Sequence, residues 1–484
     1  VATEFSRRLG LPPDDHTVVF QAALLRSIGC TAYSTESAAY FDDDVAFQAV
    51  LKELDPGDPE VFGKQIGAFG NWAGPERQPE LAQRFLDVAP TQGPVATRAA
   101  CEVGHGLADR LQLAPRTADA LDFVYERWDG RGFPGTTAGE ALPLPARVVH
   151  VSEQAVLTHG REGTAAACAE VRRRAGGHLD PALVDEFVPI GNELLGVLDA
   201  EDAFSAVVAA EPGTAMLVGT DGIRTLAEAL AMIVDLKGRY LLGHSQHVAR
   251  IARAAARELR WPDEDVMSLE IAALLHDLGR VGVPASVWDR PGPLPASDEE
   301  RARLHPYWTA RILQRCPTLC RYAEVAANHH ERLDGSGFPR GAHAGELDRA
   351  SRLLAAADAF AELTECRPNR AAFTLDDAAR AVSAEARAGR LDAESVAAVI
   401  AGAGAKQTAA PYPGGLTRRE VEVARLAAQG LSNKDIAGVL TMSPRTVGNH
   451  LARIYDKIDR RSRAGTALFL MENGLLPQEM AFAD

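Results

Sequence analysis

The chain has 484 residues, of which 46% are hydrophobic and 24% are charged. This composition is typical of globular proteins and excludes an extensively disordered chain, while the length predicts about three domains. The net charge of −15 excludes a surface that is basic throughout, although a single basic module can still bind nucleic acid.

Six cysteines are scattered along the chain, and only Cys316 and Cys320 are spaced closely enough to share a helix face. Such scatter does not indicate a disulfide framework. There is no signal-peptide pattern, and no apolar run approaches the ~20 residues that a membrane helix needs. We therefore predict a reduced, cytoplasmic protein that makes no membrane contact.

Residues 1–199 are predicted to be a helical domain that repeats the pattern of residues 222–404. Three segments recur in the same order: 22–29 with 272–279, 126–134 with 331–339, and 175–180 with 388–392. The side chains that could bind metal in the second region are replaced in the first, where the counterparts are Arg26, Ser27, Val124, Tyr125 and Glu153. We therefore expect no metal site in the first region, and a role in packing, dimerisation or ligand sensing.

An acidic run at Asp42, Asp43 and Asp44 could suggest a metal site. Short carboxylate runs are more often solvated turns, so a solvated turn is our prediction here. Glycine and proline at 211–213 and 221–222 mark the join between the two regions.

The second region begins with apolar residues at helical spacing from Gly243 to Leu259. His244 lies at the start of this predicted helix, where its imidazole can reach a neighbouring site. His247 follows one turn later and is interpreted as a surface histidine or as a support behind the site. The next predicted helix, 266–279, is strongly apolar and carries a His-Asp pair near its end, so both groups need buried partners.

Residues 328–339 read Asn-His-His-Glu-Arg-Leu-Asp-Gly-Ser-Gly-Phe-Pro and place two imidazoles and two carboxylates beside a glycine-containing turn. Together with the upstream Ala-Leu-Leu-His-Asp-Leu-Gly-Arg of 273–280, this segment resembles the HD-GYP branch of the HD metal-dependent phosphohydrolases. The resemblance covers about residues 222–404. It implies an α-helical domain built around two divalent metals, with hydrolysis of cyclic di-GMP or a related nucleotide as the activity.

The resemblance also implies a set of site residues. The expected metal ligands are His244, His276, Asp277, His305, His329, His330 and Asp358. Asp277 is expected to bridge the metals, and Arg280 to assist catalysis by holding phosphate. The residues expected to shape the turn or support the ligands are Glu331, Asp334, Gly335, Gly337 and Pro339. Imidazole and carboxylate ligands favour iron or manganese, with zinc as an alternative.

Four residues depart from the family pattern. Arg280 stands in place of lysine, Tyr240 in place of a glutamate that binds a third metal in some members, Phe338 in place of tyrosine, and Ala361 in place of an aspartate. A two-metal site is therefore the expectation. Two interpretations stay open: a phosphodiesterase that turns over its substrate, and a nucleotide or metal sensor without turnover.

Residues 401–415 are rich in alanine and glycine and are predicted to be a flexible tether. Three helix-start signals follow it, beginning at Thr417, Ser432 and Ser443. Residues 414–478 therefore form four short predicted helices. Their motifs, including Gln-Gly-Leu-Ser-Asn-Lys-Asp-Ile-Ala and Ser-Pro-Arg-Thr-Val-Gly-Asn-His, resemble the LuxR-type helix-turn-helix.

This resemblance implies DNA binding, with the recognition helix at 445–458 in the major groove. From Gly414 to Gly474 there are ten Lys and Arg against six Asp and Glu, a net of +4 within an acidic chain. Asn449 is the expected base reader, because an amide can pair with adenine. The full set of predicted DNA-binding residues is Lys434, Arg445, Thr446, Asn449, His450, Arg453 and Lys457.

The sequence thus predicts an all-α protein with two tandem HD-like domains and a LuxR-type helix-turn-helix. The partners we expect are DNA, a cyclic dinucleotide or other phosphoester, and a second copy of the chain. The predicted function is a transcriptional regulator that joins a dinuclear-metal phosphodiesterase to DNA binding.

Overall fold

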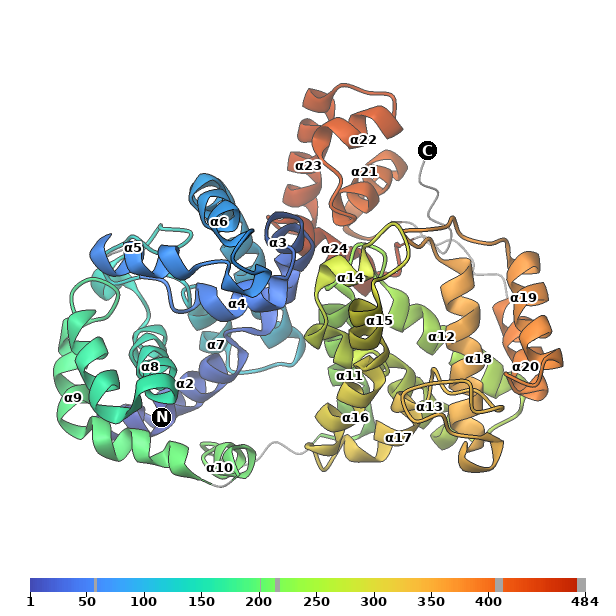
Figure 1. The fold of residues 1–484 in the computed structure, drawn as a ribbon, viewed down its shortest axis with the longest axis horizontal. Helices are drawn as coiled ribbons and strands as arrows, with labels where there is room; N and C mark the ends of the chain where they lie inside the picture. The colour runs from blue at the N-terminus through green and yellow to red at the C-terminus, as the bar shows by residue number, and fades with distance from the viewer. Residues whose placement is uncertain (56–58, 201, 214–217, 405–411, 477–484) are drawn as a thin grey trace. The chain divides into compact units, whose positions relative to one another are not determined.

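A computed structural model describes residues 1–55, 59–200, 202–213, 218–404 and 412–476. Within these ranges the regular structure is α-helical with short 3₁₀ turns, and they contain no β-strand (Figure 1). The predicted all-α fold class is confirmed. The central part of the predicted tether, 405–411, lies outside the described residues.

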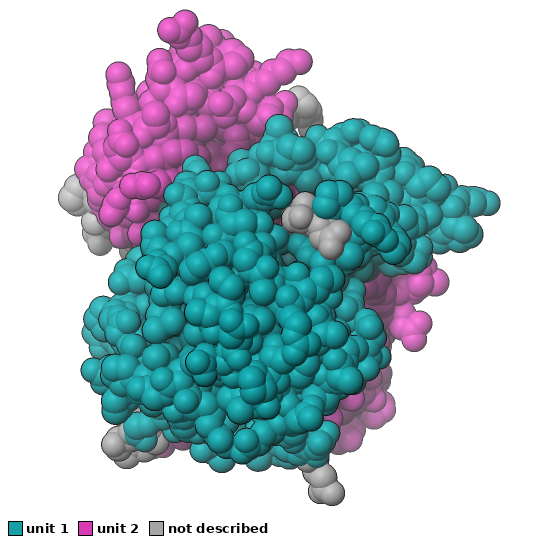
Figure 2. Space-filling model, turned by 90° about the vertical axis from the view of Figure 1, so that its left-hand side faces the viewer, with its two compact units in different colours: residues 1–32, 46–218 teal, residues 33–45, 219–484 magenta. Residues whose placement is uncertain are grey.

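The chain divides into two compact units, which Figure 2 distinguishes by colour. Unit 1 comprises residues 1–32 and 46–218, and unit 2 comprises residues 33–45 and 219–484. The short segment 33–45 therefore belongs to the unit that contains the predicted metal ligands and the helix-turn-helix.

Unit 1 is a set of helices, with a long connection over residues 122–143 between α7 and α8. They are α1 (Ala2–Arg8), α2 (Pro13–Leu25), most of α4 (Asp44–Leu51), α5 (Pro59–Ala68), α6 (Gln78–Arg110), α7 (Pro115–Leu121), α8 (Leu144–Arg173), α9 (Pro181–Leu195) and α10 (Ala203–Ala209). Several helices start with proline at the first helical position, where no backbone donor is lost. Their apolar faces pack together around Phe5 and Phe187, whose ring centroids are 5.1 Å apart.

The central part of unit 2 positions the candidate site. It contains α3 (Ser34–Phe41), α11 (Thr220–Asp235), α12 (His244–Glu258), α13 (Asp263–Leu275), α14 (Ala285–Trp288), α15 (Ala296–Arg303), α16 (His305–Gln314), α17 (Ala323–Ala327), α18 (Arg349–Thr364), α19 (Leu375–Arg387) and α20 (Ala393–Ala403). α12 packs against α13, α18 and α20. Its predicted apolar face, including Val248, Ile251 and Ala255, lies in the core.

The acidic run 42–44 is not the solvated turn that we predicted. The Asp44 carboxylate is buried, forms an ion pair with Lys237 at 2.5 Å and accepts a hydrogen bond from the Ala285 amide at 2.8 Å. Asp43 lies nearer the surface and pairs with Arg301. The prediction for Asp44 was wrong because its burial depends on segments more than 190 residues away in the sequence.

The C-terminal module of unit 2 has the four predicted helices: α21 (Arg418–Ala428), α22 (Asn433–Val439), α23 (Pro444–Ile458) and α24 (Arg463–Glu472). The three predicted helix starts are present: Thr417 and Ser432 are N-caps that form capping boxes, and Ser443 caps the helix that Pro444 begins. The apolar faces of these helices enclose a small core of their own.

The segments that recur in the sequence also share backbone features. A Cβ added to Gly29 would lie 2.0 Å from the carbonyl oxygen of Ala100, and one added to Gly279 would lie 1.9 Å from that of His305. Glycine is therefore required at both positions by a close helix approach. Later in each region, the carboxylates of Glu126 and Glu331 each accept backbone amides from the glycine-containing turn that follows.

All six cysteines have free thiols. Among the described helices, none is long and apolar enough to cross a membrane.

Candidate metal centre and DNA-binding module

Seven histidine and aspartate side chains converge within unit 2. They come from the start of α12 (His244), the end of α13 (His276 and Asp277), the start of α16 (His305), the turn after α17 (His329 and His330) and the middle of α18 (Asp358). All seven residues are buried, with at most 9% exposure. The set predicted from the sequence is thus brought together.

A close helix approach brings His305 to the His-Asp pair. Gly279 lies against the backbone of His305, where any Cβ would clash. The Thr309 hydroxyl then joins the two segments, since it donates to the His276 carbonyl at 2.8 Å and accepts from the Gly279 amide at 2.9 Å. These contacts fix α16 beside the end of α13.

The histidine rings are oriented by their own backbone. In three of them, Nδ1 lies 2.6 Å from the carbonyl oxygen three residues earlier; the pairs are His276 with Ala273, His305 with Ala302, and His329 with Ala326. Because a carbonyl can only accept, Nδ1 carries the proton and Nε2 is left with its lone pair facing inward. This arrangement is typical of metal-binding histidines.

Asp277 lies between two groups of histidines. Its Oδ2 is 3.2 Å from Nε2 of His276 and 3.5 Å from Nε2 of His244, whereas its Oδ1 is 3.3 Å from Nε2 of His305 and 3.6 Å from Nε2 of His329. Burial alone would raise the pKa of Asp277, but the nearby Arg280 guanidinium and His276 outweigh it and hold this pKa well below its usual value. The carboxylate is therefore ionised, with one oxygen facing each group.

Several polar atoms at this centre make no hydrogen bond, although Arg280 forms an ion pair with Asp277. Six of them are fully buried and have no hydrogen-bond partner among the described residues: Nε2 of His244 and His276, and both carboxylate oxygens of Asp277 and of Asp358. Unpaired buried polar atoms are costly. Three-residue groups with ligand atoms within 4.8 Å of one another include His244, His276 and Asp358 on one side and His305, His329 and His330 on the other. Lone pairs directed at common points in this way fit divalent cations.

A buried carboxylate supports the centre from behind. Glu365 accepts from Nδ1 of His244 and from Nδ1 of His247, both at 2.8 Å. Burial would raise the pKa of Glu365, but His244 and the hydrogen bonds from both imidazoles hold it well below its usual value. The prediction that His247 supports the site is consistent with this contact, whereas Glu365 was missed because no local motif marks it.

The DNA-binding module presents one polar face of α23. Val447, Leu451, Ile454 and Ile458 are buried in the module core. Arg445, Thr446, Asn449 and Arg453 lie exposed on the opposite side, His450 is half-buried, and Lys434 is exposed on α22. The Lys457 ammonium contacts the Glu420 carboxylate at 2.7 Å and the Gly415 carbonyl at 3.0 Å. This ion pair engages Lys457 within the module, while its phosphate contact stays a prediction.

Comparison with known proteins identifies both parts of unit 2. The HD domain family matches residues 228–395, and the luxR family of bacterial regulatory proteins matches residues 415–470. The chain is 31% identical over 376 residues to the 3'3'-cGAMP-specific phosphodiesterase 3 of Vibrio cholerae. The aligned region covers 76% of this chain and 80% of that protein. It belongs to the HD-GYP family.

Two further comparisons agree. A crystal structure of a cyclic GMP-AMP specific phosphodiesterase from V. cholerae matches with a TM-score of 0.56 and 25% identity, over 84% of this chain and 91% of that chain. The cyclic di-GMP phosphodiesterase of Thermotoga maritima is 32% identical over 173 residues, or 35% of this chain and 46% of that protein. The chain is thus an HD-GYP metal-dependent phosphohydrolase fused to a LuxR-type DNA-binding domain.

The arginine that replaces the family lysine lies inside the HD-GYP centre. Nε of Arg280 is 2.9 Å from Asp277 Oδ2, and the guanidinium stacks on Trp288 with 4.9 Å to the ring centroid. Its charge is therefore already engaged by the carboxylate between the two histidine groups.

The residues of the HD-GYP turn shape the backbone. Glu331 accepts from the amides of Arg340 and Ala342, each at 2.8 Å. Asp334 accepts from Ser336, and Gly335 and Gly337 occupy positions where a Cβ would lie less than 2.6 Å from a neighbouring atom. Phe338, beside Pro339, places its ring 4.6 Å from that of His330.

The counterpart of this centre in unit 1 holds an internal ion pair. The Arg26 guanidinium pairs with the Glu153 carboxylate, and it also donates to the Val124 carbonyl at 3.2 Å. Burial lowers the pKa of Arg26 and raises that of Tyr125. Within the described part of unit 1, no group of three His, Cys, Asp or Glu residues is close enough to hold a metal.

Proposed function

We propose that residues 222–404 bind two divalent metals through His244, His276, Asp277, His305, His329, His330 and Asp358, and hydrolyse a phosphodiester of a cyclic dinucleotide. The observation that carries this proposal is the set of six buried ligand atoms, on His244, His276, Asp277 and Asp358, that have no hydrogen-bond partner among the described residues. A pair of divalent metals would supply Lewis-acid stabilisation of the phosphoryl group and an activated water. Iron or manganese suits the ligand types best.

The side chains around these ligands have separate tasks in the proposal. Asp277 offers one oxygen to each histidine group, so it would be the ligand that both metals share. Arg280 holds that carboxylate ionised and aligned. Glu365 orients His244 through its Nδ1, which keeps Nε2 directed at the centre.

The substrate class follows from the relatives. Those named above act, by name, on 3'3'-cGAMP or on cyclic di-GMP. Both are cyclic dinucleotides with two phosphodiester bonds, so we propose this class for the present chain. Purified protein loaded with manganese or iron should convert at least one of them to a linear dinucleotide, as measured by chromatography.

A histidine variant tests the site itself. His276→Ala removes one ligand and should abolish turnover, whereas His16→Ala, on helix α2 of unit 1, should not. If metal-loaded protein turns over neither dinucleotide, the second candidate function holds: a DNA-binding sensor without catalysis. The engagement of Arg280 by Asp277, where the family has lysine, favours that second candidate.

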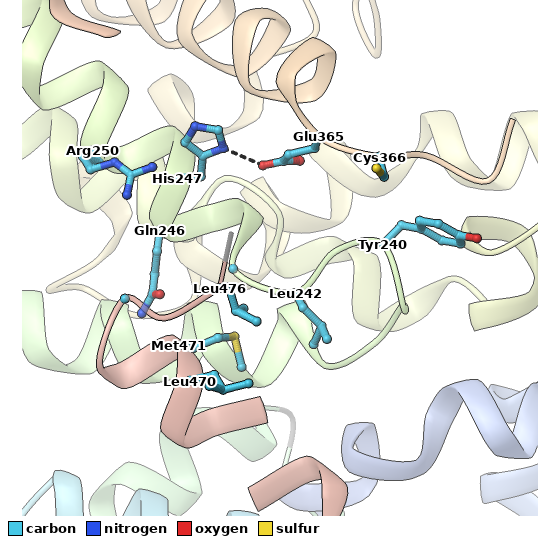
Figure 3. A pocket seen from close by; sticks show the side chains of 12 residues that line it. Tyr240, Leu242, Gln246, His247, Arg250, Glu365, Cys366, Leu470, Met471 and Leu476 are labelled. Atoms are coloured by element: carbon cyan, nitrogen blue, oxygen red, sulfur yellow. Dashed lines mark hydrogen bonds and ion pairs between the residues drawn. The ribbon is translucent and has the colours of Figure 1, made fainter. Parts of the chain in front are cut away.

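We also propose that the state of the metal centre adjusts DNA binding. A cavity of about 60 Å³ separates the two parts of unit 2, and Figure 3 shows its lining. Glu365 and His247 lie on one wall, and Leu470, Met471 and Leu476 from the end of the DNA-binding module lie on another. The cavity is far smaller than the ~300 Å³ of a ligand pocket. We therefore interpret it as part of the interface between the metal-binding part and the DNA-binding module of unit 2.

One residue of this interface, Gly243, adjoins the proposed metal ligand His244. Gly243 has φ +77° and directly precedes His244, and a Cβ built on Gly243 would lie 3.0 Å from Leu476. A shift of the His244 turn on metal binding would therefore press on the module. The wild-type DNA affinity should differ between metal-loaded and metal-stripped protein, and Leu476→Asp should remove that difference. Leu375→Asp, at an exposed position on α19, is the matched control and should keep it.

For the remaining parts, we propose that residues 1–199 are a copy of the HD-GYP domain in which the Arg26 and Glu153 pair replaces the metals. The shared backbone features around Gly29 and Gly279 support this duplication.

In the DNA-binding module, residues 414–478, Asn449 reads a base, while Lys434, Arg445 and Arg453 contact phosphates and Thr446 and His450 flank the reading residue. The full chain would bind two half-sites as a homodimer.

A further inference from the structure

A second cavity lies between α15 and the HD-GYP turn. Its volume is about 410 Å³, which falls within the range of roughly 300 to 1,000 Å³ that small-molecule sites occupy. α15 and the residue after it form one wall, and residues 337–339 of the turn form the other. None of the seven proposed metal ligands is among the residues that line it. The cavity is therefore separate from the metal centre.

Phe338 connects this cavity to the metal centre. Its ring centroid lies 4.6 Å from that of His330, with an angle of 31° between the ring planes, and 6.4 Å from that of His305. Both histidines are proposed metal ligands. A planar group in the cavity would therefore lie one aromatic ring away from the metals, a separation that a ribose and its phosphate group can span.

Arg303 covers the Phe338 ring on the side of the cavity. The carbon of its guanidinium is 4.7 Å from the ring centroid. The Arg303 side chain is nevertheless 49% exposed, and its Nη1 is 3.9 Å from Oε1 of Glu299, one turn earlier on α15. A planar guanidinium that is backed by an aromatic ring offers a flat surface, and nucleobases stack on guanidinium planes.

Glu300 lies beside this flat surface. It precedes Arg303 by three residues on α15, so the two side chains share a helix face, and both line the cavity. The Glu300 side chain is exposed and makes no hydrogen bond or ion pair within the described part of the chain. A carboxylate only accepts hydrogen bonds. Its complement on a base is an edge with two adjacent N–H donors, which guanine has at N1 and at its 2-amino group and adenine lacks.

We propose that this cavity binds a guanine base of the cyclic dinucleotide, an inference that rests on the proposed function. The base stacks on Arg303, with Phe338 behind it, and the Glu300 carboxylate accepts from N1–H and from the 2-amino group. The ribose and phosphate then extend past Phe338 towards His330. Adenine is rejected because it turns the lone pair of its N1 towards the carboxylate. Glu300 is thus the residue that determines base specificity.

Isothermal titration calorimetry of the manganese-loaded full chain with 5'-GMP and 5'-AMP tests this site. Neither probe contains a phosphodiester, so binding is measured without turnover. Wild-type protein should bind GMP about 10- to 100-fold more tightly than AMP, which is the discrimination of one bidentate contact. Glu300→Gln offers one donor and one acceptor, which suits adenine, so the preference should be lost or reversed. Glu394→Gln, at an exposed position on α20, is the matched control and should keep it.

Arg303→Lys tests the stacking surface. Lysine keeps the charge but has no planar group, so this variant should bind both mononucleotides more weakly, by on the order of tenfold. The ratio of the two affinities should stay at its wild-type value, because Glu300 is intact. Unchanged affinity for both mononucleotides would overturn the stacking role of Arg303.

The outcomes separate this inference from the proposed function. Equal affinities of wild-type protein for GMP and AMP, or a preference that Glu300→Gln leaves unchanged, would overturn the guanine site. So would absence of GMP binding in a preparation that converts cyclic di-GMP to the linear dinucleotide, and that conversion would leave the proposed function standing. Absence of both binding and conversion would overturn the proposed function and, with it, the guanine site.

Discussion

Replacing Asp44 by alanine should strongly destabilise unit 2. The Asp44 carboxylate and the Lys237 ammonium are 2.5 Å apart, with side-chain exposures of only 2% and 3%. Removing the carboxylate leaves a buried ammonium without its counter-charge, a change that costs about 3 to 5 kcal/mol. The Ala285 amide loses its acceptor as well. For a unit of this size, such a loss lowers the melting temperature by on the order of 10 °C.

The neighbouring residue provides a matched control. Asp43 pairs with Arg301, whose side chain is 45% exposed, so Asp43→Ala should cost about 0 to 1 kcal/mol. A double variant with Asp44→Leu and Lys237→Met removes both charges and should recover most of the stability that Asp44→Ala loses.

Urea unfolding followed by tryptophan fluorescence can measure these differences. Trp288 is a suitable reporter because it lies on α14, the helix whose first residue, Ala285, donates its amide hydrogen bond to Asp44. Equal losses of stability in Asp43→Ala and Asp44→Ala, both below about 1 kcal/mol, would refute the buried pair.

Three further predictions concern the centre and the DNA-binding helix. Asp277→Ala should remove both metals, because its two oxygens face different histidine groups; retention of both by elemental analysis would exclude the bridging role. Glu365→Gln should weaken Mn²⁺ binding about 10- to 100-fold, because a neutral amide aligns His244 less firmly; an unchanged affinity in a chelator competition would contradict this. Asn449→Ala should weaken operator binding by about 1 to 3 kcal/mol and spare random DNA, whereas Arg453→Ala should weaken both and reduce the salt slope by about one. Equal losses on operator and random DNA for Asn449→Ala would show that it does not read a base.

The sequence could predict features that depend on a few neighbouring residues. The capping boxes at Thr417 and Ser432 form within one helical turn, so their residue types suffice to locate the helix starts. The seven ligand-type residues were recognised in the same way, from short motifs such as the His276 and Asp277 pair. Their convergence in one buried cluster agrees with that prediction.

Other features depend on segments that are distant in the sequence. Glu365 follows Asp358 by seven residues, yet its partners His244 and His247 are 121 and 118 residues away. Lys457 lies near the exposed face of α23 and is predicted to contact phosphate, and Glu420, 37 residues earlier, forms an ion pair with it. From the sequence alone, a lysine or glutamate is predicted to lie at the surface. Its neighbours in the sequence do not show which opposite charge will lie beside it in the folded protein.

The sequence by itself determined the helical class, the helix starts and the set of candidate ligands, because helix capping and ligand motifs depend on residues that are close in the sequence. Only the tertiary structure decided which charged side chains are buried and which partners they have. It buried Asp44 against Lys237 across 193 residues, and it brought Glu365 to His244 across 121 residues. The physical reason is that the free energy of a charge depends on its distance from solvent and counter-charges, and packing alone sets these distances.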